Sequence, residues 1–222
     1  VVDPDVDRLA LVCEDGTPFG EEYTLVAVAD YVLNASTAKN KNTVSNLSST
    51  RALRDVTEKA GGEYFASAVG EVNVVTQMKA CNAIIGGEGN GGVIYPDMHY
   101  GRDALTGIAL FLTHLAKSNK TVSQLKAAYP AYVISKNKIE LTPDIDVDNV
   151  LAAVKHKYAV QRINTIDGVK IDFEKEWIHL RKSNTEPIIR IYAESSDATQ
   201  ADALAKQIIA DIQEIVSAKA LV

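Results

Sequence analysis

The sequence of 222 residues is long enough for one large domain or two modest ones with buried cores. Hydrophobic residues make up 46% and charged residues 23%, which excludes a disordered tail, a collagen-like rod or a coiled coil. With 23 basic and 29 acidic side chains, the net charge of −6 disfavours non-specific binding to nucleic acid or to an anionic membrane. Any anionic ligand must therefore meet a local cluster of positive groups.

Two features concern where the protein resides and how complete it is. Cys13 and Cys81 are too few for a disulfide framework, and neither a secretory signal nor a run of 18 apolar residues is present. We therefore expect a cytoplasmic protein without a membrane partner. The chain begins Val1-Val2-Asp3 with no initiator Met, which suggests a piece of a longer protein.

Strand and helix patterns alternate through the first half of the chain. After a short apolar run at Leu9–Val12, apolar residues share one face of a helix over Glu21–Leu33. The elements expected next are a strand over Thr43–Leu47, a helix over Thr50–Lys59, a strand over Tyr64–Val69, a helix over Val72–Lys79 and a buried strand over Ala83–Ile85, which stops before the glycine run Gly86–Gly92.

The last helix of this region begins after Asp103, a residue type that caps helices. Its apolar face is predicted to hold Leu105, Ile108, Leu112 and Leu115. The alternation of strands and helices favours an α/β domain over residues 20–118. Few apolar residues follow between Ser118 and Thr121, and Pro130 lies beyond, so residues 119–130 are predicted to be a linker.

Residues 131–222 have a different pattern, with several strands before a final helix. The expected elements are a strand over Tyr132–Leu141, a helix over Val147–Tyr158, strands over 169–173, 177–180 and 188–194 with an Asp167-Gly168 turn before the first of these, and a helix opened by Asp197 and Gln200 with the buried stripe Leu204, Ile208, Ile212 and Ile215. The predicted fold class is therefore α/β: an α/β/α layered domain with a mixed sheet, followed by a smaller α+β domain with an antiparallel sheet.

The first loop that could carry chemistry runs from Asp3 to Arg8. Asp3, Asp5 and Asp7 alternate in a short loop, where their charges repel one another unless a positive group joins them. A hard divalent cation with oxygen ligands, Mg²⁺ or Ca²⁺, is the natural partner. An EF-hand would place Glu14 at its last ligand position, but Arg8 stands where that loop requires Gly. The other alternative is a solvated acidic tail.

The second loop is the glycine run Gly86–Gly92. Glycines let the backbone approach a ligand, and Glu88 and Asn90 are the only side chains in the run that could bind hydroxyl groups. A sugar is the ligand that this pair favours, and a flexible surface turn is the alternative. The spacing of the glycines is not that of a dinucleotide-binding loop.

The third loop, Arg181–Pro187, joins two predicted strands. Its guanidinium and hydroxyl groups and the amides of a tight turn could bind one phosphate, and Arg190 could add a second positive charge. Without a Walker A sequence, a nucleoside triphosphate is not indicated. A polar hairpin turn is the alternative.

Together the three loops resemble, in order and spacing, those of the α-D-phosphohexomutase family, and the resemblance spans essentially the whole chain. Asp3, Asp5, Asp7 and Arg8 are similar to the family's Asp-x-Asp-x-Asp-Arg metal loop. The run Gly87–Gly92 is similar to its sugar loop, usually Gly-Glu-x-Ser-Gly-His, and Arg181–Pro187 to its phosphate loop, Arg-x-Ser-Asn/Gly-Thr-x-Pro. Two departures leave the preferred sugar open, because Asn90 stands where Ser is common and Gly92 where His is common.

The resemblance also implies that the chain is the C-terminal part of a four-domain enzyme. Residues 1–19 would be the metal-loop remnant of the second domain, 20–118 the sugar-binding third domain and 131–222 the phosphate-binding fourth domain. The family's nucleophile is a phosphoserine in a Ser-His-Asn-Pro loop, and none of the four His residues here follows a Ser. The catalytic serine and the N-terminal domains that carry it are therefore expected to be missing from this chain.

The function that the resemblance implies is the interconversion of hexose 1-phosphate and hexose 6-phosphate, of mannose or glucose, through a bisphosphate intermediate. Mg²⁺ would be held by the three aspartates, with Arg8 in support. The substrate would be bound by Glu88, Asn90, Arg181, Ser183, Asn184, Thr185 and Arg190. The alternatives are a phosphoglucosamine mutase and, for the chain by itself, a non-catalytic phosphosugar-binding fragment. A calcium-binding module is a third hypothesis.

Overall fold

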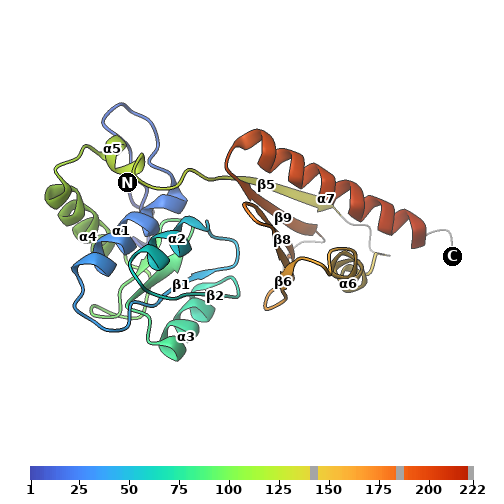
Figure 1. Cartoon of the computed structure of the whole chain (residues 1–222), viewed down its shortest axis with the longest axis horizontal. Helices are drawn as coiled ribbons and strands as arrows, with labels where there is room; N and C mark the ends of the chain where they lie inside the picture. Colours follow the sequence, from blue (N-terminus) through green and yellow to red (C-terminus); the bar gives the residue numbers. More distant parts are fainter. Residues whose placement is uncertain (141–144, 184–187, 220–222) are drawn as a thin grey trace. The chain divides into compact units, whose positions relative to one another are not determined.

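The chain folds into two compact units, Val1–Ala131 and Tyr132–Val222, which are described separately. The computed structural model describes residues 1–140, 145–183 and 188–219 (Figure 1). The predicted linker at 119–130 differs from what is observed. Helix α5 (Val122–Lys126) forms within it, begins with a capping box at Thr121, and belongs to the first unit.

The first unit is built on a mixed four-stranded sheet in the order β2-β1-β3-β4. The central strand β1 runs parallel to both of its neighbours, and β4 is antiparallel to β3. The predicted α/β class and mixed sheet are thereby confirmed. The strands are β1 (Thr43–Asn46), β2 (Tyr64–Ser67), β3 (Ile85–Glu88) and β4 (Gly92–Ile94).

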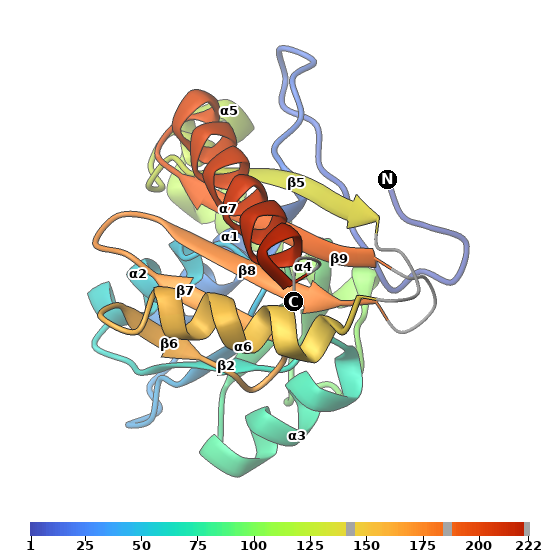
Figure 2. The ribbon, with the colours of Figure 1, turned by 90° about the vertical axis from the view of Figure 1, so that its right-hand side faces the viewer.

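Helices cover both faces of this sheet. Helix α3 packs on β1, β2 and β3, while α1 and α4 pack on each other and on β4 (Figures 1 and 2). As predicted, Asp103 caps α4, where its side chain accepts hydrogen bonds from the amides of Leu105 and Thr106. The helices are α1 (Glu21–Ala35), α2 (Ala52–Lys59), α3 (Glu71–Cys81) and α4 (Ala104–Ser118).

The sequence predicted a strand that stops before the glycine run. In the structure, the first residues of the run are part of the strand. Strand β3 extends through Gly86 and Gly87 to Glu88, and β4 begins at Gly92. A Cβ atom on Gly86 would lie 2.6 Å from Met78 Sδ and 2.8 Å from Val44 O. Glycine is needed here because the strand is packed closely between a helix and a neighbouring strand.

The predicted buried face of α4 was wrong. Leu105 and Leu112 are 64% and 55% exposed, and the buried positions are Ala104, Thr106, Gly107 and Phe111. The cause is close packing at small residues: a Cβ on Gly107 would lie 3.3 Å from Leu9 Cδ2 and 3.5 Å from Val93 Cγ2. One turn on, Phe111 meets Phe19 edge to face, with ring centroids 5.3 Å apart.

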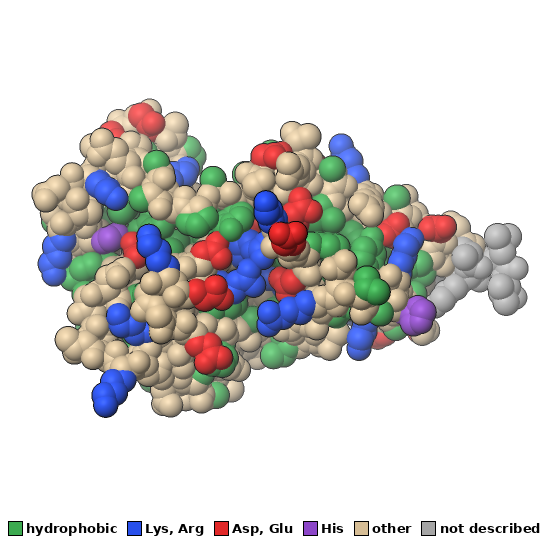
Figure 3. Space-filling model, in the orientation of Figure 1, with side chains coloured by type: hydrophobic (Ala, Val, Ile, Leu, Met, Phe, Trp, Pro, Cys, Tyr) green, Lys and Arg blue, Asp and Glu red, His purple; other side chains and the backbone are tan. Residues whose placement is uncertain are grey.

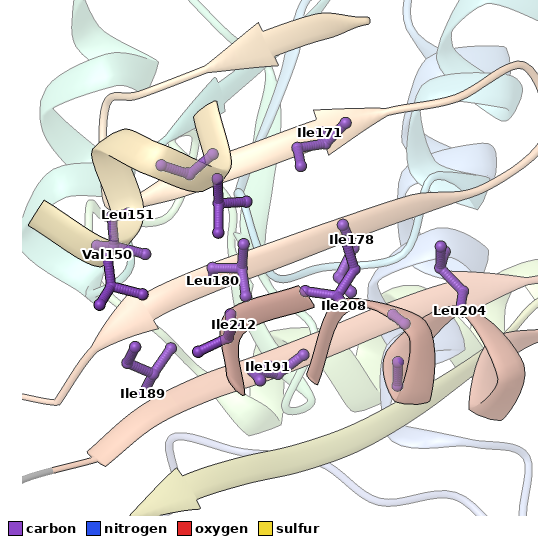
Figure 4. Packing of buried hydrophobic residues seen from close by; sticks show 14 residues of the cluster. Val150, Leu151, Ile171, Ile178, Leu180, Ile189, Ile191, Leu204, Ile208 and Ile212 are labelled. Carbon is purple, nitrogen blue, oxygen red and sulfur yellow. The ribbon is translucent and has the colours of Figure 1, made fainter. Parts of the chain in front are cut away.

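The second unit is an antiparallel sheet in the order β5-β9-β8-β7-β6, with two helices packed on one face. Alternate residues of the strands enter a core with the helices, as Figure 4 shows for Ile178, Leu180, Ile189 and Ile191 on the strands and Ile208 on a helix. The predicted α+β domain is confirmed. Its elements are β5 (Val133–Glu140), α6 (Val147–Lys157), β6 (Arg162–Asn164), β7 (Val169–Asp172), β8 (Trp177–Lys182), β9 (Ile188–Ser195) and α7 (Ala198–Lys219).

Charged groups on the first unit are interspersed rather than gathered by sign on the face shown in Figure 3. Although the chain has a net charge of −6, this face of the first unit does not carry a single acidic patch. Among the described helices, none is both long and apolar enough to cross a membrane.

His179 makes the stability of the second unit depend on pH. Its ring is 2% exposed, and Nε2 lies 2.6 Å from Asp167 O. Burial lowers the pKa of His179 to about 4, so the unfolded chain binds this proton more readily than the folded one. The free energy of unfolding should fall by about 3 kcal/mol as the pH drops from about 6.5 to about 4.

Urea unfolding followed by the fluorescence of Trp177, the single and fully buried tryptophan of the chain, measures this effect. His179→Gln should remove most of the loss between these pH values. His156→Gln, at an exposed position on α6, is the matched control and should keep the wild-type pH dependence. Identical pH profiles for wild type and His179→Gln would contradict the assignment.

Candidate functional site

The N-terminal loop brings its three aspartates together. Asp3, Asp5 and Asp7 each offer a carboxylate oxygen, and these oxygens lie within 4.8 Å of one another. The chain turns at Val6, whose φ is 59° and whose amide donates to Asp3 O at 3.0 Å. Asp3 Oδ1 also accepts hydrogen bonds from the amides of Asp7 and Arg8, at 3.2 and 3.0 Å. The loop is thus shaped so that its carboxylates converge.

Arg8 offsets part of the charge of this loop. Its Nε lies 2.6 Å from Asp3 Oδ2. Desolvation works to raise the pKa of Asp3, but the hydrogen bonds from the Arg8 amide and guanidinium lower it to about 2. Desolvation raises the pKa of Asp7, against the opposing charge of Arg102. The pKa values of Asp3 and Asp7 are therefore shifted in opposite directions within one loop.

The arrangement does not fit an EF-hand. Glu14, the last ligand in that hypothesis, accepts hydrogen bonds from the amide and hydroxyl of Ser123, the first of them at 3.1 Å. Over the described part of the chain, the only group of acidic, His or Cys side chains close enough to hold a metal is Asp3, Asp5 and Asp7. Three alternating aspartates with oxygen donors suit Mg²⁺ or another hard cation.

The metal loop lies beside the glycine run. The amide of Leu9 donates to Gly91 O at 3.0 Å, and Thr24 Oγ1 donates to Leu9 O at 3.2 Å. Gly91 has a φ of 87°, and a Cβ there would collide with the carbonyl oxygen of Leu9. On the other side, the amide of Ala104 donates to Val6 O at 3.1 Å. Backbone bonds on both sides therefore fix the aspartates next to the proposed sugar loop.

Within the glycine run, Glu88 is buried and Asn90 is half-buried. Glu88 Oε1 accepts from Asn46 Nδ2 at 2.8 Å and from the Gly70 amide at 3.1 Å, and Oε2 accepts from Arg102 Nη1 at 2.8 Å. Asn90 Oδ1 accepts from the amide of Gly92 at 3.2 Å. A carboxylate has about four acceptor positions, and three are used by donors among the described residues, which leaves one for a ligand hydroxyl.

Arg102 is the residue of this site that sequence reasoning missed. Its guanidinium contacts Asp7 Oδ2 and Glu88 Oε2, and its Nε lies 3.4 Å from Glu71 Oε2. These three carboxylates are far apart in the sequence, so no spacing pattern pointed to Arg102. The available signal was the Gly-Arg-Asp sequence just after the glycine run, at the start of a capped helix.

The proposed phosphate loop is only partly within the described structure. Arg181 lies near the end of β8 directly opposite Arg190 on β9, and Lys138 on β5 is opposite Arg190 on its other side. Ser183 is buried, and its amide donates to Ile188 O at 3.0 Å. Asn184 and Thr185 fall outside the described residues.

Like charges directly opposite each other in a sheet destabilise it. The strand register places Lys138, Arg190 and Arg181 in such a row across β5, β9 and β8. The acidic groups near the two ends of the row are Asp167, 3.8 Å from Arg181, and Glu140, 3.3 Å from Lys138. Lys138 was not identified from the sequence, because its alignment with the two arginines depends on the strand register.

Comparison with known proteins identifies the family of this chain. Residues 20–132 match the domain family described as phosphoglucomutase/phosphomannomutase, alpha/beta/alpha domain III, and residues 136–211 match its C-terminal domain. A phosphoglucomutase/phosphomannomutase of Thermococcus kodakarensis is 33% identical over 90% of this chain and 43% of its own length. A phosphoglucosamine/phosphogalactosamine mutase of Sulfurisphaera tokodaii is 32% identical over 98% of this chain and 47% of its own length. The chain belongs to the α-D-phosphohexomutase family and spans less than half the length of these curated relatives.

Solved structures have the same fold. A phosphoglucomutase/phosphomannomutase family protein of Burkholderia thailandensis has a TM-score of 0.82 at 24% identity, over 98% of this chain and 46% of its own. An N-acetylphosphoglucosamine mutase of Aspergillus fumigatus, in complex with GlcNAc-6P and magnesium, has a TM-score of 0.63 at 15% identity, over 93% of this chain and 50% of its own.

Gly89, in the turn of the glycine run, has room for a side chain only if the carboxylate of Glu22 moves. Its amide donates to Ser49 Oγ at 2.9 Å, and a Cβ on it would collide with the carboxylate of Glu22, which accepts from the Thr50 amide at 2.9 Å. Gly89→Ala should therefore destabilise the first unit by about 1–3 kcal/mol, as overpacking does. Chemical unfolding followed by circular dichroism measures this change.

Gly107→Ala is the matched control, because the residue lies inside helix α4 and its Cβ would meet Leu9 only at 3.3 Å. Alanine is favoured over glycine in a helix by about 1 kcal/mol, which offsets the tight contact. We expect its stability within about 1 kcal/mol of wild type. Equal stabilities for Gly89→Ala and wild type would contradict the prediction, because they would show that the turn can hold a Cβ atom at this position.

Proposed function

We propose that this chain is the C-terminal part of a phosphohexose mutase that interconverts hexose 1-phosphate and hexose 6-phosphate. The observation that carries the proposal is the adjacency of two loops: hydrogen bonds at Leu9 and Gly91 join a three-carboxylate cluster to the hairpin that carries Glu88 and Asn90. A cation site and a hydroxyl-binding site side by side suit a sugar phosphate. The family to which the chain belongs supports the reaction class.

The residues of the metal loop fit Mg²⁺. The donors are carboxylate oxygens within 4.8 Å of one another, and Asp7 Oδ1 is buried without a hydrogen bond among the described residues. The A. fumigatus relative was solved with magnesium. A bound Mg²⁺ would supply charge compensation for a phosphoryl group in transfer. Arg8 would keep Asp3 ionised and correctly turned for such an ion.

Sugar-binding residues are proposed for the first unit and phosphate-binding residues for the second, each by itself. Glu88 would accept a hydrogen bond from a sugar hydroxyl at its remaining acceptor position, with Asn90 beside it. The phosphate that is not transferred would be bound by the cationic row and the phosphate loop, that is, by Arg181, Arg190, Ser183, Asn184 and Thr185, with Lys138 added from the strand register. Binding energy at this remote phosphate would orient the reacting hydroxyl.

The proposal assigns the nucleophile to another part of a longer protein. Such a protein would carry a phosphoserine loop in its N-terminal domains and would return the phosphoryl group from a bisphosphate intermediate to that serine. This chain alone would be inactive. Turnover of hexose phosphate by the purified 222-residue chain would contradict this division of roles.

A phosphoglucosamine mutase is the second candidate. The observation that favours it is the set of names among the relatives, which include a probable phosphoglucosamine mutase of Methanopyrus kandleri, 28% identical over 96% of this chain. Comparison of kcat/KM for mannose, glucose and glucosamine phosphates in the longer protein would decide between the candidates.

Arg181→Ala in the longer protein should raise KM for a hexose phosphate roughly 10- to 100-fold. A hydrogen bond to a charged group contributes about 1.5–3 kcal/mol, and its loss weakens binding by that factor. Steady-state kinetics of the Mg²⁺-supplied enzyme measures the change. Arg162→Ala, which removes an exposed arginine from β6 of the same unit, is the control and should keep wild-type KM. An unchanged KM for Arg181→Ala would overturn the phosphate assignment.

A further inference from the structure

We propose that Arg102 is a positioning residue that couples divalent-cation binding at the metal loop to the orientation of Glu88. Its guanidinium contacts Asp7 in one loop and Glu88 in the other at the same time. What each loop binds rests on the proposed function. The side-chain link between Asp7 and Glu88 rests on the contacts of Arg102.

Arg102 contacts Asp7 and Glu88 through its two terminal nitrogens, while its Nε makes no hydrogen bond among the described residues. Nη2 contacts Asp7 Oδ2, Nη1 lies 2.8 Å from Glu88 Oε2, and Nε lies 3.4 Å from Glu71 Oε2. The backbone amide of Arg102 also donates to Glu71 Oε1 at 2.9 Å, which fixes the start of the side chain. The Arg102 side chain is only 19% exposed and that of Glu88 only 6%. Partly buried charges of this kind need their partners, so the geometry is constrained at both ends.

At the metal loop, Arg102 leaves one Asp7 oxygen for a cation. Oδ2 is taken by the guanidinium, while Oδ1 is buried and accepts no hydrogen bond from the described residues. The nearest cationic atom recorded for it is Arg8 Nε, at 3.5 Å. Carboxylates that ligate metals are usually held by a hydrogen bond at the other oxygen, and loss of that partner typically costs 10- to 100-fold in metal affinity.

At the sugar loop, Arg102 is the charged donor to Glu88. The other donors, Asn46 Nδ2 and the amide of Gly70, are neutral and act on Oε1. A divalent cation bound to Asp7 would attract the negative charge of the carboxylate that Arg102 also contacts. The strength of the interaction between the guanidinium and Glu88 Oε2 would then change. Occupation of the metal loop is therefore transmitted to the group proposed to bind the sugar.

Gly92 provides the space for the Arg102 side chain. A Cβ on Gly92 would lie 2.5 Å from Arg102 Cδ and 3.2 Å from its Cγ. Gly92→Ala would therefore displace Arg102 without altering any charge. This variant separates the placement of the guanidinium from its charge.

The test is calorimetric titration of the 222-residue chain with MgCl₂ alone. Arg102→Lys keeps the charge but replaces the planar fork with a point charge, and Arg102→Met removes both. We expect both variants to bind Mg²⁺ at least tenfold more weakly than wild type, and Gly92→Ala to shift in the same direction. Arg54→Lys and Arg54→Met are the controls and should stay within twofold of wild type, because Arg54 makes only a 3.9 Å surface pair with Glu58.

Two results would overturn the proposal. Wild-type affinity in Arg102→Lys, or tighter binding in Arg102→Met, would show that Arg102 acts as a charge and does not position Asp7. If wild type binds no Mg²⁺, the metal assignment of the proposed function fails, and the link between the loops is decided without Mg²⁺.

The measurement that needs no Mg²⁺ is a double-mutant cycle of Asp7→Asn and Glu88→Gln, in which the shift of Tm is measured for each variant. Coupling through Arg102 predicts that the two shifts are non-additive in the wild-type background and additive in the Arg102→Met background. Additive shifts in both backgrounds would overturn the link, whichever ligand the site binds.

Discussion

The crowding of carboxylates at one side of the first unit is the constraint on which the proposed site depends. Asp3, Asp5 and Asp7 each bring a carboxylate oxygen within 4.8 Å of the others, so their like charges repel one another. Arg8 and Arg102 offset part of this repulsion through their contacts with Asp3 and Asp7. The proposed function assigns the rest of the balance to a divalent cation bound by the three carboxylates.

The fold of the first unit serves this constraint by placing backbone against backbone. Leu9, which is 2% exposed, packs on Gly107 of α4 and hydrogen-bonds to Gly91 in the hairpin. Small residues at these contacts let the N-terminal segment come close enough for Asp7 to reach Arg102. The same packing explains why α4 turns Gly107 and Phe111 inward and leaves Leu105 in solvent.

Much of this could be predicted from the sequence, because alternating polarity and helical spacing depend on neighbouring residues. The strands, most helices and the Asp103 cap are local features, and so are the three loops. Features that depend on tertiary contact could not be predicted in this way. Arg102 is defined by partners far away in the chain, Lys138 by strand register, and the β3 glycines by the close approach of Met78.

The most direct test of whether the metal loop and the sugar loop form one site is an NMR titration of the 15N-labelled chain with Mg²⁺. We expect saturable shifts of the amide signals at residues 3–8 and also at 87–92, with no comparable shifts on helix α6 of the second unit. Asp5→Asn should abolish both sets of shifts, because it removes a proposed ligand without touching the hairpin. Shifts confined to residues 3–8, or no saturable shifts at all, would contradict the account.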